Sequence, residues 1–560
     1  MTDLIQEHIY HRETFSTMLK SSSPAQFKPI KLIDIELTNG IDDISMAEGY
    51  RGIQALIRLH GMPIGSLDIS CENGGCSRKQ LIRNITDNYS ESILRHLLLR
   101  RLGAGPAYEP FTLDELLYGS HSPCLEKKPK LSVVVSTRDR TEQLALCLDA
   151  LNRIDYPNAD LLVIDNSPRT NTTEQLVKNK FPGIRYILEP RPGLNWARSR
   201  AIVESMGEIL AYVDDDAVVD QYWSHAMVEL FAKNPEVMAA TGLVVPYELE
   251  TETQVIFEKI YGGFGKGFVR KWHQADGFLQ IPVAKPYSGV FICGTGANMA
   301  YRREVFDKIG QFDPVLDVGT PTNGGGDLEM FFRVLKAGHV LVYEPAAFVR
   351  HIHRSDHEGL RKQLMGWGTG FLSYLIQNML AYPDERKTFS KKALWWLWRV
   401  TLPRIFNSQP VRVPRGLYRA ETFGALTGLF CFLKSRLNAT KVKRAYGSPD
   451  WFVKPEYRLE PCVQSTKWDT GERSIDLSDG IAALTDVTGY ARTKISLNWN
   501  GKPEGVLNIS NHHMPIGSSR LQDAIVDFMG LRLVKFEDHI SSEPFSALLR
   551  TIIYEWLDHK

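Results

Sequence analysis

Three adjacent aspartates, Asp214, Asp215 and Asp216, follow an apolar run at residues 209–213 that is typical of a buried strand. Adjacent carboxylates repel one another, so such a cluster costs stability unless a cation compensates for its charge. Divalent cations such as Mg²⁺ or Mn²⁺ prefer oxygen ligands and commonly bridge protein carboxylates to phosphate groups. A solvated acidic turn is the alternative interpretation, but the position directly after a buried strand favours a metal site.

A fourth aspartate, Asp165, follows another apolar run at residues 159–164 and opens the sequence Asp-Asn-Ser. This composition is also common in turns. At the end of a strand, however, the carboxylate could accept a hydrogen bond from the N–H of a nucleotide base. Residues 136–140, Ser-Thr-Arg-Asp-Arg, end the apolar run at 131–136 and could contact phosphate and ribose.

A glycine run, Gly324–Gly326, precedes Asp327 and an amphipathic helix that we expect to end near Gly338. Asp327 could simply cap this helix. The glycines indicate more, because they allow another molecule to approach the backbone closely, and a carboxylate at such a place can act as a general base. Glu329 lies four residues before Arg333 and could pair with it on the helix.

Two histidines, His351 and His353, follow a predicted strand at residues 340–343. Alternate residues of an extended segment face the same way, so both imidazoles could lie on one face. One of them could bind a metal, but either could also be an ordinary polar contact. The spacing alone leaves both interpretations open.

The segments that must position these side chains alternate between strand-like and helix-like patterns from residue 131 onward. The predicted strands cover residues 131–136, 159–164, 184–188 and 208–213, and the predicted helices cover residues 141–154, 175–180 and 196–206. This alternation predicts an α/β domain with a mostly parallel, Rossmann-like sheet covered by helices on both faces. Ligands of such sheets bind at the carboxyl ends of the strands, where the candidate side chains lie.

Five motifs occur in a fixed order along this region: Ser132–Arg140, Val163–Ser167, Gly193–Arg198, Val213–Asp216 and Gly326–Asp327. Together they resemble the family-2 glycosyltransferases of the GT-A fold, and the resemblance covers about residues 130–360. Each motif alone is weak, but five motifs in this order and at fitting spacings are specific. The resemblance implies a nucleotide-diphosphate sugar donor, a divalent cation (Mn²⁺ or Mg²⁺) and inversion at the anomeric carbon.

The resemblance also assigns roles by position. Asp165 corresponds to the aspartate that reads a uracil-type base, and Asp327 corresponds to the catalytic base, with Glu329 as the reserve candidate because Gly326 stands where the family commonly has glutamate. The predicted metal ligands are Asp214, Asp216 and His351. The predicted donor-binding residues are Thr137, Arg138, Arg140, Asp165, Arg198, Asp214, Asp215 and Gly294.

The chemistry expected of this site is sugar transfer to a hydroxyl group. Asp327 would take the proton of an acceptor hydroxyl as it attacks in line, and the cation would neutralise charge on the leaving diphosphate. We expect the acceptor to be a glycan or a lipid-linked glycan in bacterial polysaccharide synthesis. One alternative is a catalytically silent, transferase-like scaffold or glycan-binding protein. A nucleotidyltransferase is another, but the Gly-rich N-terminal loop with a basic signature that is usual in that class is not found.

An internal repeat flanks the central region. Residues 35–70 align with residues 475–510 at a constant offset of 440, and 12 of 36 positions are identical, whereas chance would give about two. Both copies have strand-like runs closed by a turn and then a helical stretch. We therefore predict one small β-rich module used twice, and these modules could bind glycan, pair with each other or form a homodimer.

The patterns divide the chain into four parts. They are residues 1–125 with the first module and a helical tail, 130–360 with the GT-A domain, 361–450 with a helical extension rich in basic residues and tryptophan, and 465–560 with the second module.

The charge balance and the cysteines limit the function classes. Lys and Arg total 66 and Asp and Glu total 65, a net charge of +1, which excludes a generally basic nucleic-acid-binding protein, so we expect no nucleic-acid partner. Hydrophobic residues make up 43% of the chain and can supply a full core. Seven cysteines, mostly far apart, predict no disulfide framework. With no recognisable signal peptide, the sequence favours a cytoplasmic protein.

One segment of the helical extension suggests a membrane surface. Residues 386–419 contain nine Lys or Arg and no acidic residue, and Trp395, Trp396 and Trp398 lie among them. Such a composition suits the anionic inner face of a plasma membrane, whereas the alternative is a helical cap over the sheet. Residues 363–383 carry no charge, but their glycines and amides argue against a membrane span.

Overall fold

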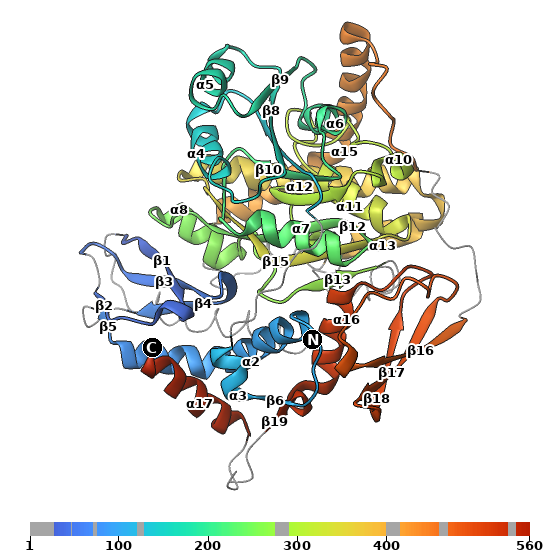
Figure 1. Cartoon of the computed structure of the whole chain (residues 1–560). Helices are drawn as coiled ribbons and strands as arrows, with labels where there is room; N and C mark the ends of the chain where they lie inside the picture. Colours follow the sequence, from blue (N-terminus) through green and yellow to red (C-terminus); the bar gives the residue numbers. More distant parts are fainter. Residues whose placement is uncertain are drawn as a thin grey trace.

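The computed structural model describes residues 27–45, 48–70, 75–119, 128–274, 290–398, 415–457, 469–535 and 545–560. Within them, a nine-stranded sheet forms the centre of the molecule (Figure 1). Its strands follow one another in the order β11 (Ala217–Val219), β15 (Val340–His351), β12 (Val237–Pro246), β14 (Asn298–Arg302), β10 (Ile209–Asp214), β7 (Leu131–Thr137), β8 (Ala159–Asn166) and β9 (Arg185–Glu189). The last strand, β13 (Lys271–His273), pairs with β15.

The first half of this sheet is parallel, as the sequence predicts. Strands β10, β7, β8 and β9 pair in parallel, and their apolar runs are buried because helices cover both faces. The other half is mixed. Strand β14 runs antiparallel to both of its neighbours, and β11 and β13 run antiparallel to β15, so the sheet as a whole is less uniformly parallel than predicted.

Helices cover both faces of the sheet. Neighbouring strand residues point to opposite faces, so the apolar strands present side chains to helices on both. Val133 and Val135 of β7 belong to the same hydrophobic cluster as α4 (Thr141–Leu151) and α7 (Trp223–Lys233). Between them in sequence, Val134 belongs to the cluster on the other face, with α6 (Leu194–Glu204) and α11 (Gly326–Lys336). The short helix α5 (Thr172–Lys180) follows β8.

Two long helices pack against each other beside the sheet, and α13 (Arg386–Trp396) follows the first of them. These are α12 (His357–Ala381) and α15 (Arg415–Tyr446), and glycines hold them close: a Cβ at Gly368 would lie 2.0 Å from the carbonyl oxygen of Glu421. Among the described residues, no helix combines the length and the hydrophobicity that crossing a bilayer requires.

Two small sheets lie on the other side of the molecule (Figure 1). One contains β1 (Ile30–Glu36), β3 (Gly52–Leu59) and β4 (Met62–Ser70), and the other contains β16 (Thr470–Asp476), β17 (Arg492–Trp499) and β18 (Lys502–Ser510). Both have a parallel pair followed by an antiparallel pair. The register starts at Ile30 opposite Gly52 in the first sheet and at Thr470 opposite Arg492 in the second, a shift of 440 for both residues.

One hydrophobic core joins these two terminal regions. It contains buried residues of both small sheets and of α2 (Arg78–Gly103), α16 (Ser518–Met529) and α17 (Phe545–His559). A short parallel pair of strands, β6 (Phe111–Thr112) and β19 (Val534–Lys535), also links them. In addition, the Trp499 indole Nε1 donates to the Ala107 carbonyl at 2.7 Å. The beginning and the end of the described chain therefore fold against each other.

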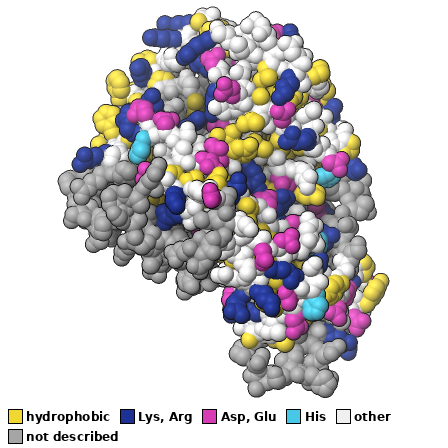
Figure 2. Space-filling view, turned by 90° about the vertical axis from the view of Figure 1, so that its left-hand side faces the viewer, with side chains coloured by type: hydrophobic (Ala, Val, Ile, Leu, Met, Phe, Trp, Pro, Cys, Tyr) yellow, Lys and Arg dark blue, Asp and Glu magenta, His cyan; other side chains and the backbone are white. Residues whose placement is uncertain are grey.

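The remaining short elements are β2 (Ile44–Ser45), β5 (Gly75–Cys76), α3 (Leu113–Tyr118), α8 (Glu252–Val255), η2 (Ile256–Tyr261), η3 (Val290–Cys293) and α10 (Val305–Ile309). Figure 2 shows basic and acidic side chains interspersed over one face of the molecule, in agreement with the formal net charge of +1.

Candidate active site

Three neighbouring strands place their polar side chains at one edge of the sheet. Strands β10, β7 and β8 are parallel, with Asp214 opposite Ser136 and Thr137 opposite Asp165. The carboxyl ends of parallel strands meet at the same edge, so the sequence motifs that end these strands come together there. This edge is the candidate active site.

Asp214, Asp216 and His351 form a group whose ligand atoms lie within 4.8 Å of one another. His351 reaches this group because β15 continues to His351 itself, beyond the end predicted near residue 343, and pairs with β11 just after the aspartates. The His351 Nε2 atom lies 3.2 Å from Asp216 Oδ1. Two carboxylates and one imidazole are a ligand set that suits Mn²⁺ or Mg²⁺, so these residues fit the expected cation.

The other aspartate of the cluster, Asp215, binds the protein instead. Thr137 Oγ1 donates to Asp215 at 2.7 Å, and Arg140 bridges Asp215 and Asp216 at 2.5 and 2.6 Å. Burial raises the pKa of Asp215 to about 7 although Arg140 opposes this. Burial acts in the same direction on Asp216, but His351 and Arg140 outweigh it and the pKa of Asp216 is lowered. Thr137 and Arg140, predicted to contact the donor, thus support the cluster.

A chain of contacts continues from the metal group into the protein. His351 Nδ1 lies 3.2 Å from His353 Nδ1, and His353 Nε2 lies 3.1 Å from Glu258 Oε2. If His353 Nε2–H donates to Glu258, its Nδ1 is the acceptor and His351 donates from Nδ1. Nε2 is then the His351 atom that would bind a cation held together with Asp214 and Asp216. Sequence reasoning missed Glu258, because it lies about 95 positions before its partner and carries no local signal.

Asp165 has a buried carboxylate with one free oxygen. The Tyr186 hydroxyl donates to Asp165 Oδ2 at 3.0 Å, while Oδ1 is buried and has no hydrogen-bond partner among the described residues. Burial raises the pKa of Asp165 to about 6. A buried acceptor without a partner is costly, and the N–H of a bound base would satisfy it.

Asp327 and the metal group are connected by the short segment Gly296–Ala297. Its Oδ2 accepts from the Gly296 N–H at 2.9 Å and its Oδ1 accepts from the Leu328 N–H at 2.9 Å. The next residue, Ala297, accepts from the Asp214 N–H at 3.3 Å. Burial raises the pKa of Asp327, as does neighbouring Asp317. The predicted base and the predicted metal ligands therefore flank the same two residues.

Arg198 and Gly294 lie in the same region. Arg198 is buried and its guanidinium donates to Asp317 at 2.6 Å. Burial lowers the pKa of Arg198, but Asp317, Asp214 and Asp327 outweigh it and the pKa is raised. Gly294 has a φ of +125°, and a Cβ there would lie 2.4 Å from Thr241 Oγ1, so the turn requires glycine. Arg138 is partly exposed, with its Nε 3.8 Å from Asp139 Oδ2.

Glu329, the reserve candidate for the base, points away from this chemistry. Its carboxylate binds Arg333 through two contacts of 2.9 and 2.6 Å, and both side chains are fully buried. The predicted pairing with Arg333 is confirmed. Since both carboxylate oxygens are engaged by one guanidinium, Glu329 stabilises α11 and leaves Asp327 as the candidate base.

The glycine run before α11 has a different reason from the one predicted. A Cβ at Gly325 would lie 2.5 Å from the Gly370 carbonyl oxygen, and a Cβ at Gly370 would lie 2.6 Å from the Gly324 carbonyl carbon. The backbone that approaches these glycines closely is that of α12 in the same chain, and not that of another molecule. The run therefore seats α12 against the loop that carries Asp327.

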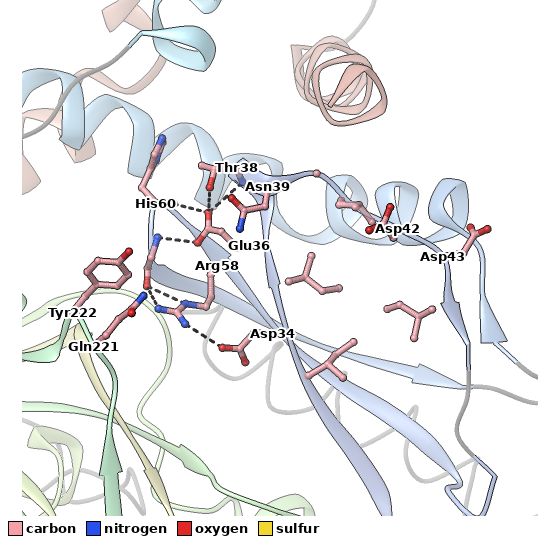
Figure 3. A pocket seen from close by; sticks show the side chains of 16 residues that line it. Asp34, Glu36, Thr38, Asn39, Asp42, Asp43, Arg58, His60, Gln221 and Tyr222 are labelled. Atoms are coloured by element: carbon pink, nitrogen blue, oxygen red, sulfur yellow. Dashed lines mark hydrogen bonds and ion pairs between the residues drawn. The ribbon is translucent and has the colours of Figure 1, made fainter. Parts of the chain in front are cut away.

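A cavity of about 640 Å³ lies elsewhere, between β1, β3 and the loop at Gln221 and Tyr222 (Figure 3). Two of its carboxylates already have partners: Asp34 Oδ2 pairs with Arg58 at 3.1 Å, and Glu36 accepts from the backbone N–H groups of His60 and Gly61. Because these carboxylates are satisfied within the protein, we place the active site at the strand ends and not in this cavity.

Comparison with known proteins points to the same region. Residues 132–310 match the family model described as Glycosyl transferase family 2. A Drosophila melanogaster protein described as a putative polypeptide N-acetylgalactosaminyltransferase 13 is 26% identical over 242 residues, which cover 40% of this chain and 42% of that protein. The glucosyl-dolichyl phosphate glucuronosyltransferase of Haloferax volcanii is 23% identical over 291 residues, covering 46% of this chain and 85% of that protein.

Among solved structures, a mannosyltransferase from Pyrobaculum calidifontis in complex with GDP-Man and Mn²⁺ is similar at 15% identity. The match covers 67% of this chain and 89% of that protein, with a TM-score of 0.32. For the first curated relatives, the match spans only 26%, 42% and 37% of their length.

Proposed function

Residues 132–310 form a domain of glycosyl transferase family 2, and from this premise we propose that the chain is an inverting, metal-dependent glycosyltransferase. It would move a sugar from a nucleotide-diphosphate sugar to a hydroxyl group of its acceptor. The observation that carries this proposal is the short segment Gly296–Ala297, which holds Asp327 on one side and Asp214 on the other. A base and a diphosphate site must lie this close for one displacement to use both.

The mechanism follows from the side chains of the site. Asp327 accepts the proton of the acceptor hydroxyl, and the two backbone N–H groups that bind its oxygens fix its orientation. Asp165 accepts from the base of the donor and orients it. Asp214, Asp216 and His351 would hold the divalent cation, which when bound neutralises charge on the leaving diphosphate. A single in-line displacement inverts the anomeric carbon and needs no covalent intermediate.

We propose a glycan or lipid-linked glycan as the acceptor, in polysaccharide biosynthesis. The Haloferax relative is named a glucosyl-dolichyl phosphate glucuronosyltransferase, and this name supports a lipid-linked acceptor. The name of the Drosophila relative would instead favour a polypeptide acceptor. Both kinds of acceptor offer a hydroxyl group to the same base, so the experiment must separate them.

Purified protein can be incubated with Mn²⁺ and a panel of nucleotide sugars, with lipid-linked glycan or peptide as acceptor, and the release of nucleotide diphosphate measured. We expect acceptor-dependent release with the lipid-linked glycan. Asp327→Asn should lower the rate by about 10²–10⁴-fold and leave donor binding nearly intact. Glu329→Gln is the matched carboxylate control. It should lower the stability of the protein more than its rate of transfer. No turnover with any donor would favour a silent scaffold.

We also propose that the two terminal regions are copies of one module that pair within the chain. Glu36 accepts from the backbone N–H groups of His60 and Gly61, and Asp476, at the position shifted by 440, accepts from those of Asn500 and Gly501. This shared pair of hydrogen bonds from the turn to a carboxylate supports a common origin of the two terminal regions. The shared hydrophobic core supports pairing inside one chain over a homodimer.

We propose that the protein works in the cytoplasm at the inner face of the plasma membrane. The predicted segment at residues 386–419 includes 399–414, which lie outside the described residues. In the described part, Trp398 is 66% exposed, whereas Trp396 packs on Phe371 with ring centroids 5.4 Å apart. Trp398 is therefore the tryptophan whose exposure best supports contact with lipid headgroups.

A further inference from the structure

Helix α15 has one face fixed on its neighbour α12. A Cβ at Gly424 would lie 2.0 Å from the Met365 carbonyl oxygen, so the two backbones touch. The Thr369 hydroxyl also donates to the Gly424 carbonyl at 3.0 Å. Close contact through glycine and a hydroxyl hydrogen bond leaves α15 little freedom to rotate. The face of α15 opposite α12 therefore points in a fixed direction, away from α12.

The opposite face of α15 is apolar and exposed. Phe430 is 70% exposed and Leu437 is 67% exposed, although both are large hydrophobic side chains. The exposed apolar residues of this helix are Phe423, Leu426, Leu429, Phe430, Leu433 and Leu437. Steps of three and four residues from 423 to 437 place them on one stripe, about 21 Å long at 1.5 Å per residue. Single exposed apolar side chains are common, but a continuous stripe marks a binding surface.

The charges around this stripe are almost all positive. Helix α15 contains seven Lys or Arg residues and one acidic residue, Glu421. Lys434 and Arg436 are exposed beside the stripe, and Lys441 and Arg444 are exposed beyond its C-terminal end. A second copy of the chain placed stripe to stripe would bring these cations together with only one acidic residue on each α15 to offset them, which is unfavourable. An anionic lipid surface supplies both the negative charge and the apolar layer.

The stripe also lies close to the proposed site. Ser435 of α15 donates from its hydroxyl to the Val315 carbonyl at 2.5 Å, and α12 lies directly against the glycine run before Asp327. Figure 1 shows α15 at the upper edge of the molecule, away from the two small sheets. A bilayer at this edge would lie against α15, which packs on α12, and α12 in turn contacts the loop that carries Asp327.

We infer that the apolar stripe of α15 docks on an anionic phospholipid bilayer, with its aliphatic and aromatic side chains at the level of the acyl boundary and its cations among the headgroups. This surface lies in residues 416–446, outside most of the basic segment predicted from sequence. It depends on exposure and charge and not on the transferase assignment, so a failure of the proposed activity would leave it standing.

The test is sedimentation of the full chain with vesicles of phosphatidylcholine alone and of phosphatidylcholine mixed with phosphatidylglycerol. We expect binding to the anionic vesicles only. Phe430→Ser combined with Leu433→Ser should weaken it by about 100-fold or more, because each side chain contributes on the order of 1.5–3 kcal/mol when it is buried. Lys434→Gln combined with Arg436→Gln should weaken it by about 30-fold at low salt, since each cation contributes on the order of 1 kcal/mol.

Leu146→Ser on α4 is the matched control, since Leu146 is also an exposed apolar side chain, at 43%. It should bind vesicles like the wild type, and all variants should keep the wild-type thermal transition because the altered side chains are exposed. Equal binding of the Phe430/Leu433 variant and the wild type would overturn the inference. A dimer in solution that this variant dissociates, without vesicle binding by the wild type, would overturn it in favour of a second copy.

Discussion

Asp215 and Asp216 are adjacent, but their contacts divide their roles. Asp215 is engaged by the Thr137 hydroxyl and by Arg140. Asp216 shares Arg140 but also faces His351 at 3.2 Å, and together with Asp214 these side chains form the one described group suited to a metal. A ligand must keep an oxygen available for the cation. We therefore expect Asp216 to be a metal ligand and Asp215 to support the cluster.

Asp216→Asn should abolish metal-dependent donor binding while the fold survives. The amide keeps the shape of the side chain but removes one anionic ligand, which should cost more than the roughly 10–100-fold that outer contacts of metal sites contribute. Calorimetry with UDP and Mn²⁺ measures this affinity. Asp149→Asn, at a surface carboxylate paired with Lys180, is the control. Wild-type affinity in the Asp216 variant would contradict the assignment.

We expect recognition of the base through Asp165 to depend on pH. Its carboxyl has a pKa raised to about 6, with burial as the main cause and the Tyr186 hydrogen bond opposing it. A protonated carboxyl is a poorer acceptor for a base N–H, so affinity for uridine should fall as pH decreases through about 6. Uridine is the suitable probe because it carries no phosphate that titrates in the same range.

Tyr186→Phe extends this prediction. Without the phenol hydrogen bond the carboxylate loses a stabilising donor, so the pKa of Asp165 rises further and the midpoint of the binding curve moves to higher pH. Nuclear magnetic resonance titration of uridine at several pH values measures both midpoints. A curve that is flat between pH values on either side of 6 would show that Asp165 does not read the base.

At the scale of elements, the two turns of the small sheets provide a matched pair. Gly61 and Gly501 have φ values of +80° and +74°, but a Cβ at Gly61 would lie 2.7 Å from the Tyr222 ring, whereas a Cβ at Gly501 would meet nothing within 4 Å. The first turn therefore contacts the central domain closely. Both positions favour glycine because the backbone is left-handed, but only Gly61 also lacks room for a Cβ.

Gly501→Ala should cost about 1 kcal/mol, the usual strain of a left-handed alanine. Gly61→Ala should cost roughly 1 kcal/mol more, because the ring of Tyr222 must also move. Thermal unfolding of the two variants measures the difference. Adding Tyr222→Ala should remove the excess in the Gly61 variant and change the Gly501 variant no more than the wild type. Equal losses in both single variants would contradict a tight contact at Gly61.

Local patterns predicted the elements of the central domain well. The strand predicted at residues 208–213 is β10 (Ile209–Asp214), and the strand at 131–136 is β7 (Leu131–Thr137), because buried parallel strands are apolar runs that end at polar residues. Long-range pairing leaves no such pattern. The antiparallel course of β14 and the contact of Glu258 with His353 depend on residues distant in sequence, so neither could be predicted.

At the scale of the molecule, the two ends of the chain bury each other. The side chains of Leu549, Ile553, Trp556 and Leu557 on α17 are almost fully buried in the core that also contains α2 and both small sheets. Arg78, the first residue of α2, donates to the carbonyl groups of Leu557 and Asp558 at 3.0 and 2.8 Å. The sequence match between residues 35–70 and 475–510 predicts a repeat, but it does not predict this shared core, because an apolar face does not show which other face it will pack against.

Removal of residues 536–560 should therefore destabilise a region more than 400 positions earlier in the chain. Without α17, the apolar side of α2 is exposed, and each lost core residue of the Leu or Trp type costs about 2–5 kcal/mol. Limited trypsin digestion with mass spectrometry should show new cleavage within residues 27–119, while residues 130–360 stay protected by their own two-sided core. The full-length variant Trp556→Ala with Leu557→Ala should give the same cleavage pattern more weakly, which separates loss of packing from loss of chain. Protection of residues 27–119 in the truncated chain would mean that the first module folds alone, and that the core shared by the two ends is not needed for its stability.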